Sequence, residues 1–198
     1  MTKKLIILGS AIRGGALLIL DSLKRASSKM YEPVGILDDT PGIEGTEVLS
    51  VPILGGLDKA ENLYKKNFFD EAIIAVGNVE GRRKIFQNIL NTNIRLANII
   101  DESVLFRSSV SIGIGNIILS GCDFGPFVSI GDNNFFCSHT IVEHESRIGD
   151  GSLFGIGCTF AGRVRVGNSV SCGARSGAQA DVTIENHSVI PPGIIIQQ

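Results

Sequence analysis

The sequence lacks the features that mark nucleic-acid-binding and membrane-spanning proteins. Its 18 lysine and arginine residues are outnumbered by 20 aspartate and glutamate residues, which gives a net charge of −2 and a pI near 5.9. Without a basic excess, we expect no broad surface for nucleic acid. No apolar run approaches the about 20 residues that a membrane span needs. Neither a nucleic acid nor a membrane is therefore an expected partner.

We also expect no secretion signal. Lys3 and Lys4 precede the apolar residues 5–8, an order that can be mistaken for the start of a signal peptide. Arg13 interrupts the apolar run and no Ala-x-Ala cleavage site follows, so this region instead predicts a strand and then a helix. We therefore expect a cytoplasmic protein.

Cysteine is scarce and poorly spaced for cross-linking. The chain has Cys122, Cys137, Cys158 and Cys172, with no C-x-x-C pair among them. In the repeat described next, Cys122 and Cys158 fall in one column two coils apart, about 9.5 Å at the usual strand spacing. This separation is too large for a disulfide. We expect small, packed thiols in a reducing compartment.

What the sequence does contain is a six-residue repeat through its C-terminal half. Every sixth residue is apolar in a chain that is only 43% apolar overall, and a small or acidic residue often follows. These positions are Phe106, Ile112, Ile118, Phe124, Ile130, Phe136, Val142, Ile148, Phe154, Phe160, Val166, Cys172, Ala178, Ile184, Ile190 and Ile196. Such regularity is not a product of composition, and it is typical of a repeat architecture.

The repeat predicts a parallel β-helix over residues 103–198. A six-residue unit with one large inward side chain describes a short strand and a turn, and three units close a triangular coil of eighteen residues. The chain marks this larger period, with about five coils, at Ile112-Gly113, Ile130-Gly131, Ile148-Gly149, Val166-Gly167 and Ile184-Glu185. Antiparallel hairpins are the alternative, but they would alternate with a period of two.

Residues 1–102 alternate strand and helix patterns and predict a small, parallel, Rossmann-like α/β sheet. The predicted strands are 5–8, 34–37, 72–76 and 96–100, and the predicted helices run to about residue 26, over 57–66 and around 85–89. Residues 40–56 are rich in proline and glycine and predict a loop. The boundary between the two domains is expected near residues 101–104.

A glycine-rich turn, residues 9–15, lies between the first strand and the first helix. The free N–H groups of a helix N-terminus at this place can bind a phosphate. Asp38, at the end of the next strand, can hold a ribose hydroxyl. The turn has Ala11 in place of the middle glycine of a dinucleotide fingerprint, so a purely structural turn is the alternative.

Several segments carry a family resemblance. They are the Gly9 turn, Gly35-Ile-Leu-Asp-Asp39, Ile53-Leu-Gly-Gly56, Ala75-Val-Gly-Asn78, Ile141-Val-Glu-His-Glu-Ser-Arg-Ile-Gly149 and Phe160-Ala-Gly-Arg163. Over nearly its whole length the chain resembles the PglD-like bacterial nucleotide-sugar N-acetyltransferases, the bacillosamine N-acetyltransferase family. The resemblance implies a left-handed β-helix and a homotrimer with active sites between neighbouring helices. It also implies transfer of acetyl from acetyl-CoA to the amino group of a UDP-linked deoxyamino sugar, with the nucleotide held by the N-terminal domain.

The resemblance also assigns roles to particular residues. His144 matches the family's general base, and Glu145 matches the carboxylate that follows it, with Glu143 as a second candidate. Contacts with the nucleotide sugar are expected at Gly9, Ala11, Ile12, Arg13, Asp38, Asp39, Asn78 and Cys137. Contacts with acetyl-CoA are expected at Leu153, Gly162, Ala174 and Pro192. No metal is expected.

The chemistry of acyl transfer fits a histidine. A thioester is already activated, so its attack by an amine needs mainly a base and an N–H group that stabilises the oxyanion. An imidazole, with a pKa near 6.5, suits this task near neutral pH. Of the three histidines, His139 and His187 are expected on the surface, and an exposed corner residue without catalytic function is the alternative for His144.

The sequence departs from the family at several places. Leu153 stands where the family often has a histidine that contacts acetyl-CoA, and Cys137 stands where it commonly has an asparagine near the sugar. Ile12 and Arg13 replace a Gly-His pair in the turn, and Pro191-Pro192 replaces a glycine-rich unit. We expect Arg13 to pair with a diphosphate by charge, in place of the missing contacts of the turn.

Three other functions are open. An O-acetyltransferase acting on a sialic-acid-like sugar, as in NeuD-like relatives, can use the same base. A non-catalytic trimeric scaffold or sugar-binding protein would result if the departures mark lost activity. The γ-class carbonic anhydrases share the β-helix and use two histidines five residues apart, as His139 and His144 are. They need a third histidine near the position of Ser103, and no histidine precedes His139.

Overall fold

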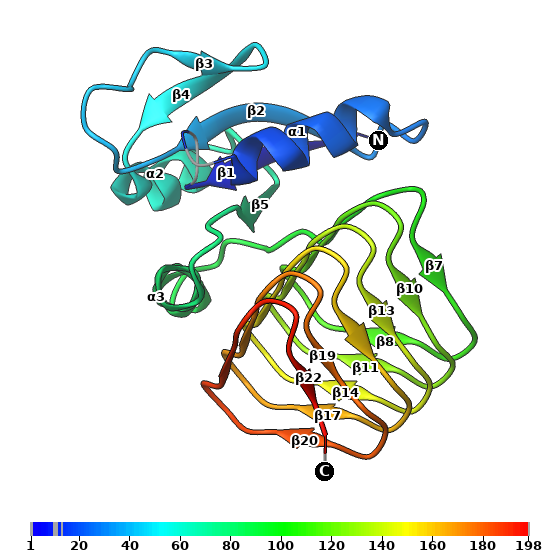
Figure 1. The fold of residues 1–198 in the computed structure, drawn as a ribbon. Coiled ribbons are helices and arrows are strands. Elements are labelled where there is room, and N and C mark those ends of the chain that lie inside the picture. Colours follow the sequence, from blue (N-terminus) through cyan, green and yellow to red (C-terminus); the bar gives the residue numbers. More distant parts are fainter. Residues whose placement is uncertain (1, 10–11, 13, 198) are drawn as a thin grey trace.

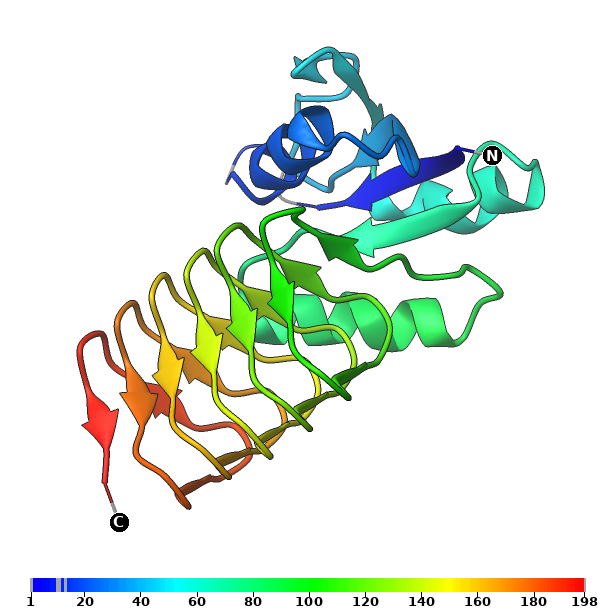
Figure 2. The same cartoon turned by 90° about the vertical axis from the view of Figure 1, so that its right-hand side faces the viewer.

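The structure is a computed structural model that describes residues 2–9, 12 and 14–197. It consists of an N-terminal α/β part and a C-terminal β-helix (Figure 1). The coils of the β-helix run away from the α/β part, and the C-terminus lies at the far end (Figure 2). The predicted fold class, a Rossmann-like sheet followed by a left-handed parallel β-helix, is confirmed.

The α/β part contains a five-stranded sheet with the strand order β3-β4-β2-β1-β5. Its strands are β1 (Lys3–Leu8), β2 (Tyr31–Leu37), β3 (Glu47–Val48), β4 (Val51–Gly55) and β5 (Glu71–Ile74). Its helices are α1 (Gly15–Arg25), the 3-10 turn η1 (Leu57–Lys59), α2 (Ala60–Lys65) and α3 (Val79–Leu90). All neighbouring strands are parallel except the β3–β4 pair.

Two expectations for this part were wrong. Residues 40–56 are not only a loop, because they include the β3–β4 hairpin and β4 pairs with β2. Alternate residues of β4, beginning with Val51 and Ile53, are buried, a two-residue period that the many proline and glycine residues obscure. Residues 96–100 are not one strand: Leu96 forms a bridge with Ala72 of β5, whereas Ile99–Ile100 is strand β6 of the β-helix.

The two faces of the sheet pack against different partners. One face, with Leu5 and Ile7, packs against α1 and against the β-helix residues Ile117 and Phe135. The opposite face packs against α2 and α3, and its core includes Ile6, Leu8, Leu37, Ala60, Ala72, Ile74 and Ile89. One apolar core therefore extends from the sheet into the first coils of the β-helix, so the two domains share buried surface.

The β-helix has three flat walls of parallel strands. Wall 1 comprises β7 (Leu105–Phe106), β10 (Asp123–Phe124), β13 (Ile141–Val142), β16 (Thr159–Phe160), β19 (Gly177–Ala178) and β22 (Ile195–Ile196). Wall 2 comprises β8 (Ser111–Ile112), β11 (Ser129–Ile130), β14 (Arg147–Ile148), β17 (Arg165–Val166) and β20 (Thr183–Ile184). Wall 3 comprises β6 (Ile99–Ile100), β9 (Ile117–Ile118), β12 (Phe135–Phe136), β15 (Leu153–Phe154), β18 (Ser171–Cys172) and β21 (Val189–Ile190).

The predicted inward positions form the core of the β-helix. Residues at nearly all of them are buried and belong to a single cluster, to which the side chains of Cys122, Cys158 and Cys172 also belong. Four of its phenylalanines contact one another in sequence: Phe136 and Phe154 stack nearly parallel at 4.6 Å between ring centroids, and each packs edge-to-face against a further phenylalanine. All four cysteines are free thiols, as expected, and burial raises the pKa of Cys122 to about 11.

Strand β6 shows where the β-helix begins to form. Ile99–Ile100 pairs with β9 and so extends wall 3 ahead of the predicted boundary at residues 102/103, which itself stays a prediction. No helix among the described residues is long and apolar enough to cross a membrane.

Candidate active site

His144 lies at the corner between walls 1 and 2, in the turn that joins β13 to β14. Glu145 adopts a left-handed backbone conformation with φ of 59° and turns the chain there. Backbone hydrogen bonds hold this turn between its neighbouring coils: Glu145 N donates to Pro126 O at 2.9 Å, and Arg163 N donates to His144 O at 2.9 Å. The position of His144 is thus fixed by the coil stacking rather than by a flexible loop.

The imidazole of His144 lies over Gly162 on the next coil. A Cβ atom at Gly162 would lie 2.5 Å from Nε2 and 2.6 Å from Cε1 of the ring, closer than real Cβ contacts allow. Gly162 is therefore the residue that leaves room for the ring. Its predicted contact with acetyl-CoA stays a prediction, but the structure gives it this second role beside the predicted base.

Glu145 is the acidic residue that contacts His144. Its Oε2 lies 3.0 Å from Nδ1 of His144, and the two side chains are 55% and 45% exposed. A carboxylate at this nitrogen favours the tautomer with the proton on Nδ1 and leaves the Nε2 lone pair free to accept a proton. This geometry favours Glu145 over Glu143 as the assisting carboxylate.

A second ion pair on the same corner explains why Glu145 is available to His144. Arg163 donates to both carboxylate oxygens of Asp181, with Nε–Oδ1 2.7 Å and Nη2–Oδ2 2.8 Å. The hydrogen bonds from Arg163 lower the pKa of Asp181. Because Asp181 takes up the guanidinium, no hydrogen bond from Arg163 competes with His144 for Glu145 among the described residues.

The expected nucleotide contacts lie at the carboxyl ends of the sheet strands. Gly9, Ile12, Asp38 and Asp39 line a cavity of about 590 Å³ together with Thr40, Pro41, Leu57 and Val76. Gly9 has φ of 79°, and a Cβ there would lie 2.5 Å from Cγ2 of Val76, so the turn requires glycine. Of the other expected contacts, Ala11 and Arg13 lie outside the described residues.

Both aspartates of this cavity already hold local backbone N–H groups. Oδ1 of Asp38 accepts a hydrogen bond from Thr40 N at 2.8 Å, and Oδ1 of Asp39 accepts one from Leu57 N at 2.7 Å. These bonds orient the carboxylates at the end of β2. Carboxylate oxygens at the end of this strand can accept hydrogen bonds from the hydroxyl groups of a ribose.

A second cavity, of about 430 Å³, lies between the sheet and wall 3. It is lined by Gly15, Leu18, Val76, Gly77, Asn78, Phe135, Cys137 and Leu153. It brings together Asn78 and Cys137, which are expected sugar contacts, and Leu153, which is an expected acetyl-CoA contact. Val76 lines both this cavity and the expected nucleotide cavity at Asp38 and Asp39, so the two are neighbours along the edge of the sheet. Asn78 also caps α3, since its Oδ1 accepts a hydrogen bond from Gly81 N at 2.8 Å.

The structure does not bring all predicted site residues together within one chain. His144 and Gly162 lie on the corner opposite wall 3, whereas Cys137 and Leu153 lie against the α/β part at wall 3. Ala174 and Pro192 lie on a different corner, between walls 3 and 1, where they stack on successive coils. The predicted site is thus divided between separate places on one chain.

The remaining histidines are exposed surface residues, as expected. His139 and His144 lie on different corners of the coil, separated by β13. Among the described residues, no three or more His, Cys, Asp or Glu side chains form a group that could hold a metal ion.

Sequence reasoning missed the residues that join the two domains, Arg82 and Asp101, which are 0% and 4% exposed. A signal for Arg82 is present in the sequence. It precedes Ile85, Phe86 and Ile89 by three, four and seven residues, which places it on the apolar face of α3.

Comparisons with known proteins agree with this architecture. Residues 4–89 match the PglD N-terminal domain family. The acetyltransferase domain of PglB from Neisseria gonorrhoeae FA1090, in complex with acetyl coenzyme A, is similar to this chain with a TM-score of 0.72 at 19% identity. That match covers 100% of this chain and 97% of the PglB chain.

Two further solved structures are similar over the whole chain. GDP-perosamine N-acetyl transferase from Caulobacter crescentus, a histidine-to-alanine mutant in complex with CoA and GDP-perosamine, matches with a TM-score of 0.66 at 22% identity, covering 98% of this chain and 93% of that one. WeeI from Acinetobacter baumannii AYE matches with a TM-score of 0.61 at 16% identity, covering 98% and 97%. Residues 4–89 thus match the PglD N-terminal domain, and the whole chain has the fold of these solved structures.

Proposed function

We propose that this protein is an acetyl-CoA-dependent N-acetyltransferase that acts on the amino group of a nucleotide-linked deoxyamino sugar, with His144 as the general base. The observation that carries the proposal is the contact of His144 Nδ1 with Glu145 Oε2 at 3.0 Å, made by a ring that lies over Gly162. This arrangement directs Nε2 away from its carboxylate partner, where it can accept a proton.

The proposed transfer needs little from the protein beyond positioning. As the sugar amine attacks the thioester carbonyl, a C–N bond forms and Nε2 of His144 accepts the amine proton. The C–S bond then breaks, and the same proton passes to the leaving thiolate. Glu145 stabilises the transient imidazolium by charge. The products are an acetamido sugar and the free thiol of CoA.

A homotrimer would complete the site that one chain leaves divided. In this arrangement, the His144 corner of one chain faces the interdomain cavity and wall 3 side of a neighbour. Exposed apolar side chains beside the His144 corner support the idea, since Ile141 and Phe127 are 39% and 65% exposed. Light scattering should then give three times the chain mass of 21.1 kDa.

The nucleotide of the substrate has two candidates, since uridine was expected from the family resemblance whereas the Caulobacter crescentus structure contains GDP-perosamine. The cavity at Asp38 and Asp39 supports a nucleoside diphosphate of either kind, because both share the ribose and the diphosphate. We further propose that the protein works in the cytoplasm, where acetyl-CoA and nucleotide sugars are made.

The test combines acetyl-CoA with UDP-, dTDP- and GDP-linked 3- and 4-amino-deoxy sugars and measures release of free thiol. We expect release with one amino sugar, and a loss of about 10² to 10⁴ in turnover in His144→Ala. Glu143→Gln is the matched control and should keep activity. Release only with a hydroxyl acceptor would indicate an O-acetyltransferase. Binding of nucleotide sugars without any release would indicate a binding protein.

A further inference from the structure

Arg82, on helix α3, is a fully buried cation. Its side chain is 0% exposed, and among the described residues no carboxylate forms an ion pair with it. Instead, Nε donates to Asn133 O at 2.9 Å, Nη2 donates to Gly115 O at 3.0 Å, and Nη1 donates to Ile74 O. The guanidinium also lies 5.7 Å from the ring centroid of Phe135.

These acceptors belong to both domains. Ile74 ends β5 in the α/β part, whereas Gly115 and Asn133 lie on successive coils at the corner between walls 2 and 3. One side chain of α3 therefore joins the edge of the sheet to two coils of the β-helix. The planar fork of an arginine, with five N–H donors, can donate to several carbonyl groups in fixed directions at once.

Burial of this charge costs free energy, and a gain in the stability of the fold does not account for it. Burial lowers the pKa of Arg82 to about 9, which still leaves the guanidinium charged at neutral pH. A buried charge is often no more stabilising than an apolar residue of similar size. The position of Arg82 is therefore better explained by the geometry that it fixes between the two domains.

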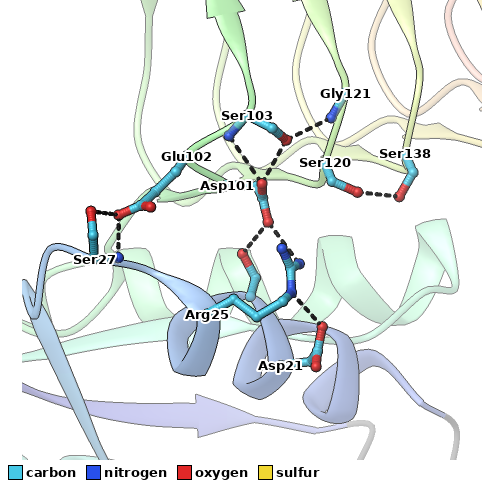
Figure 3. Close-up of polar contacts among 10 residues, drawn as sticks. Asp21, Arg25, Ser27, Asp101, Glu102, Ser103, Ser120, Gly121 and Ser138 are labelled. Carbon is cyan, nitrogen blue, oxygen red and sulfur yellow. Dashed lines mark hydrogen bonds and ion pairs between the residues drawn. The ribbon is translucent and has the colours of Figure 1, made fainter.

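A second contact fixes α1 in the same way (Figure 3). The buried carboxylate of Asp101 accepts hydrogen bonds from Ser22 Oγ and Arg25 Nη2, both at 2.9 Å, and from Ser103 Oγ at 2.7 Å. Next to it, Glu102 accepts a hydrogen bond from Ser27 Oγ at 2.7 Å. The C-terminal end of α1 is thus attached to the first coil of the β-helix.

Both attached helices contribute their N-terminal ends to the interdomain cavity. Gly15 and Leu18 of α1 and the capping residue Asn78 of α3 line it opposite Cys137 and Leu153. Arg82 lies one turn from Asn78, and its backbone N–H donates to Asn78 O at 2.8 Å. A shift of Arg82 would therefore move the wall of this cavity.

We propose that Arg82 is a positioning residue that sets the distance between the nucleotide cavity and the β-helix, and so makes the enzyme select amino sugars that carry a nucleotide. This inference rests on the proposed function. In a substrate whose nucleotide is bound, the amine lies at a fixed distance from the nucleotide. The reaction of this amine therefore depends on the relative position of the two domains. The same amino sugar without a nucleotide enters by diffusion and does not depend on that distance.

The experiment compares kcat/KM for a nucleotide-linked amino sugar with kcat/KM for the methyl glycoside of the same amino sugar. Arg82→Lys keeps the charge but has three donors in place of five, and Arg82→Met removes the donors. We divide kcat/KM for the nucleotide-linked sugar by kcat/KM for the methyl glycoside. We expect this ratio to fall at least tenfold in Arg82→Lys and further in Arg82→Met. An unfolded fraction of the protein lowers both kcat/KM values by the same factor and leaves their ratio unchanged, because both acceptors are measured on one preparation.

The matched control is Arg83→Gln, which removes the neighbouring arginine of the same helix. Arg83 is partly exposed and pairs with Glu80 at 2.8 Å, away from the domain interface. The ratio of the two kcat/KM values in Arg83→Gln should equal the ratio in the wild type. If both acceptors lose activity equally in Arg82→Lys, Arg82 is merely structural and the inference is overturned.

A second readout separates this inference from the proposed function. If the wild type acetylates no amino sugar, the proposed function fails, and hydrogen exchange then tests the positioning itself. Arg82→Lys should raise exchange in residues 71–90 and 113–134 together, whereas Arg83→Gln should not. Exchange equal to that of Arg83→Gln would overturn the positioning role, whatever the activity.

Discussion

Replacement of Gly162 with alanine adds one methyl group under the imidazole of His144 and so tests whether the position of this proposed base matters for turnover. The added Cβ would lie 2.5 Å from Nε2 of His144, whereas an ordinary contact begins at 3.4 Å, so the ring must move by about 1 Å. A misplacement of this size can cost about 10² in rate. The backbone of Gly162 does not have a positive φ, and the equivalent residue of the next coil, Ala180, already has a methyl group. We therefore expect a large loss of turnover with little change in stability.

The assay is thiol release at saturating substrates, beside thermal unfolding of the same preparations. The wild type, Gly162→Ala, His144→Ala and the double variant form a cycle that measures coupling between the two residues. If Gly162 acts by leaving room for the imidazole, Gly162→Ala should reduce turnover about 10- to 100-fold in the wild type. It should have no further effect once His144 is absent. Ala180→Gly, at the same corner, is the control and should keep turnover.

Two results would refute this reasoning. Turnover of Gly162→Ala within threefold of the wild type would show that the ring can move without loss of function. Equal losses in the presence and absence of His144 would show that Gly162 acts elsewhere, as its predicted contact with acetyl-CoA would require. A large drop in the unfolding temperature would instead place the effect in the fold of the corner.

Three further predictions follow from the same structure. Glu145→Gln should lower turnover about tenfold with little change in KM, because the amide loses the charge that stabilises the imidazolium, whereas Glu143→Gln should change neither value; equal effects would remove the preference for Glu145. Burial alone would raise the pKa of Asp101, but hydrogen bonds from Ser103 and from α1 outweigh it and lower the pKa below its usual 3.8. Because the folded-state pKa is the lower one, this stabilisation is present above about pH 4 and is lost as the pH falls further, so denaturant unfolding of Asp101→Asn should show a weaker pH dependence than the wild type there; equal slopes would contradict this. Arg13→Ala should weaken the binding of a nucleoside diphosphate in calorimetry, and unchanged affinity would exclude the predicted charge pairing.

The α/β part shows both the success and the limits of prediction from the sequence. The strands β1, β2 and β5 and the order of strands and helices follow from local apolar patterns, because each pattern has the period of its own element. The β3–β4 hairpin was missed because its two-residue turn, Leu49-Ser50, contains no glycine or asparagine although both residues have positive φ values of 48° and 67°. Pairing with β2 stabilises a turn that local preferences disfavour.

The candidate site shows the same division. The sequence indicated His144 and Glu145 because a short motif places them next to each other, and adjacency along the chain survives folding. It did not indicate that Gly162 lies under the imidazole. That contact joins residues of two coils and depends on the stacking of one coil on the next.

The sequence by itself determined the β-helix, since one apolar residue in every six can be buried in a regular way only if the chain coils around a common axis. The tertiary structure alone decided how the two domains meet. Arg82 and Asp101 are charged residues that sequence rules assign to the surface, yet both are buried because hydrogen-bond partners from the other domain surround them. Such partners lie dozens of residues away along the chain, so no local pattern encodes them. The position of His144 on the corner opposite the interdomain cavity is decided in the same way, by the order of the walls in the folded coil.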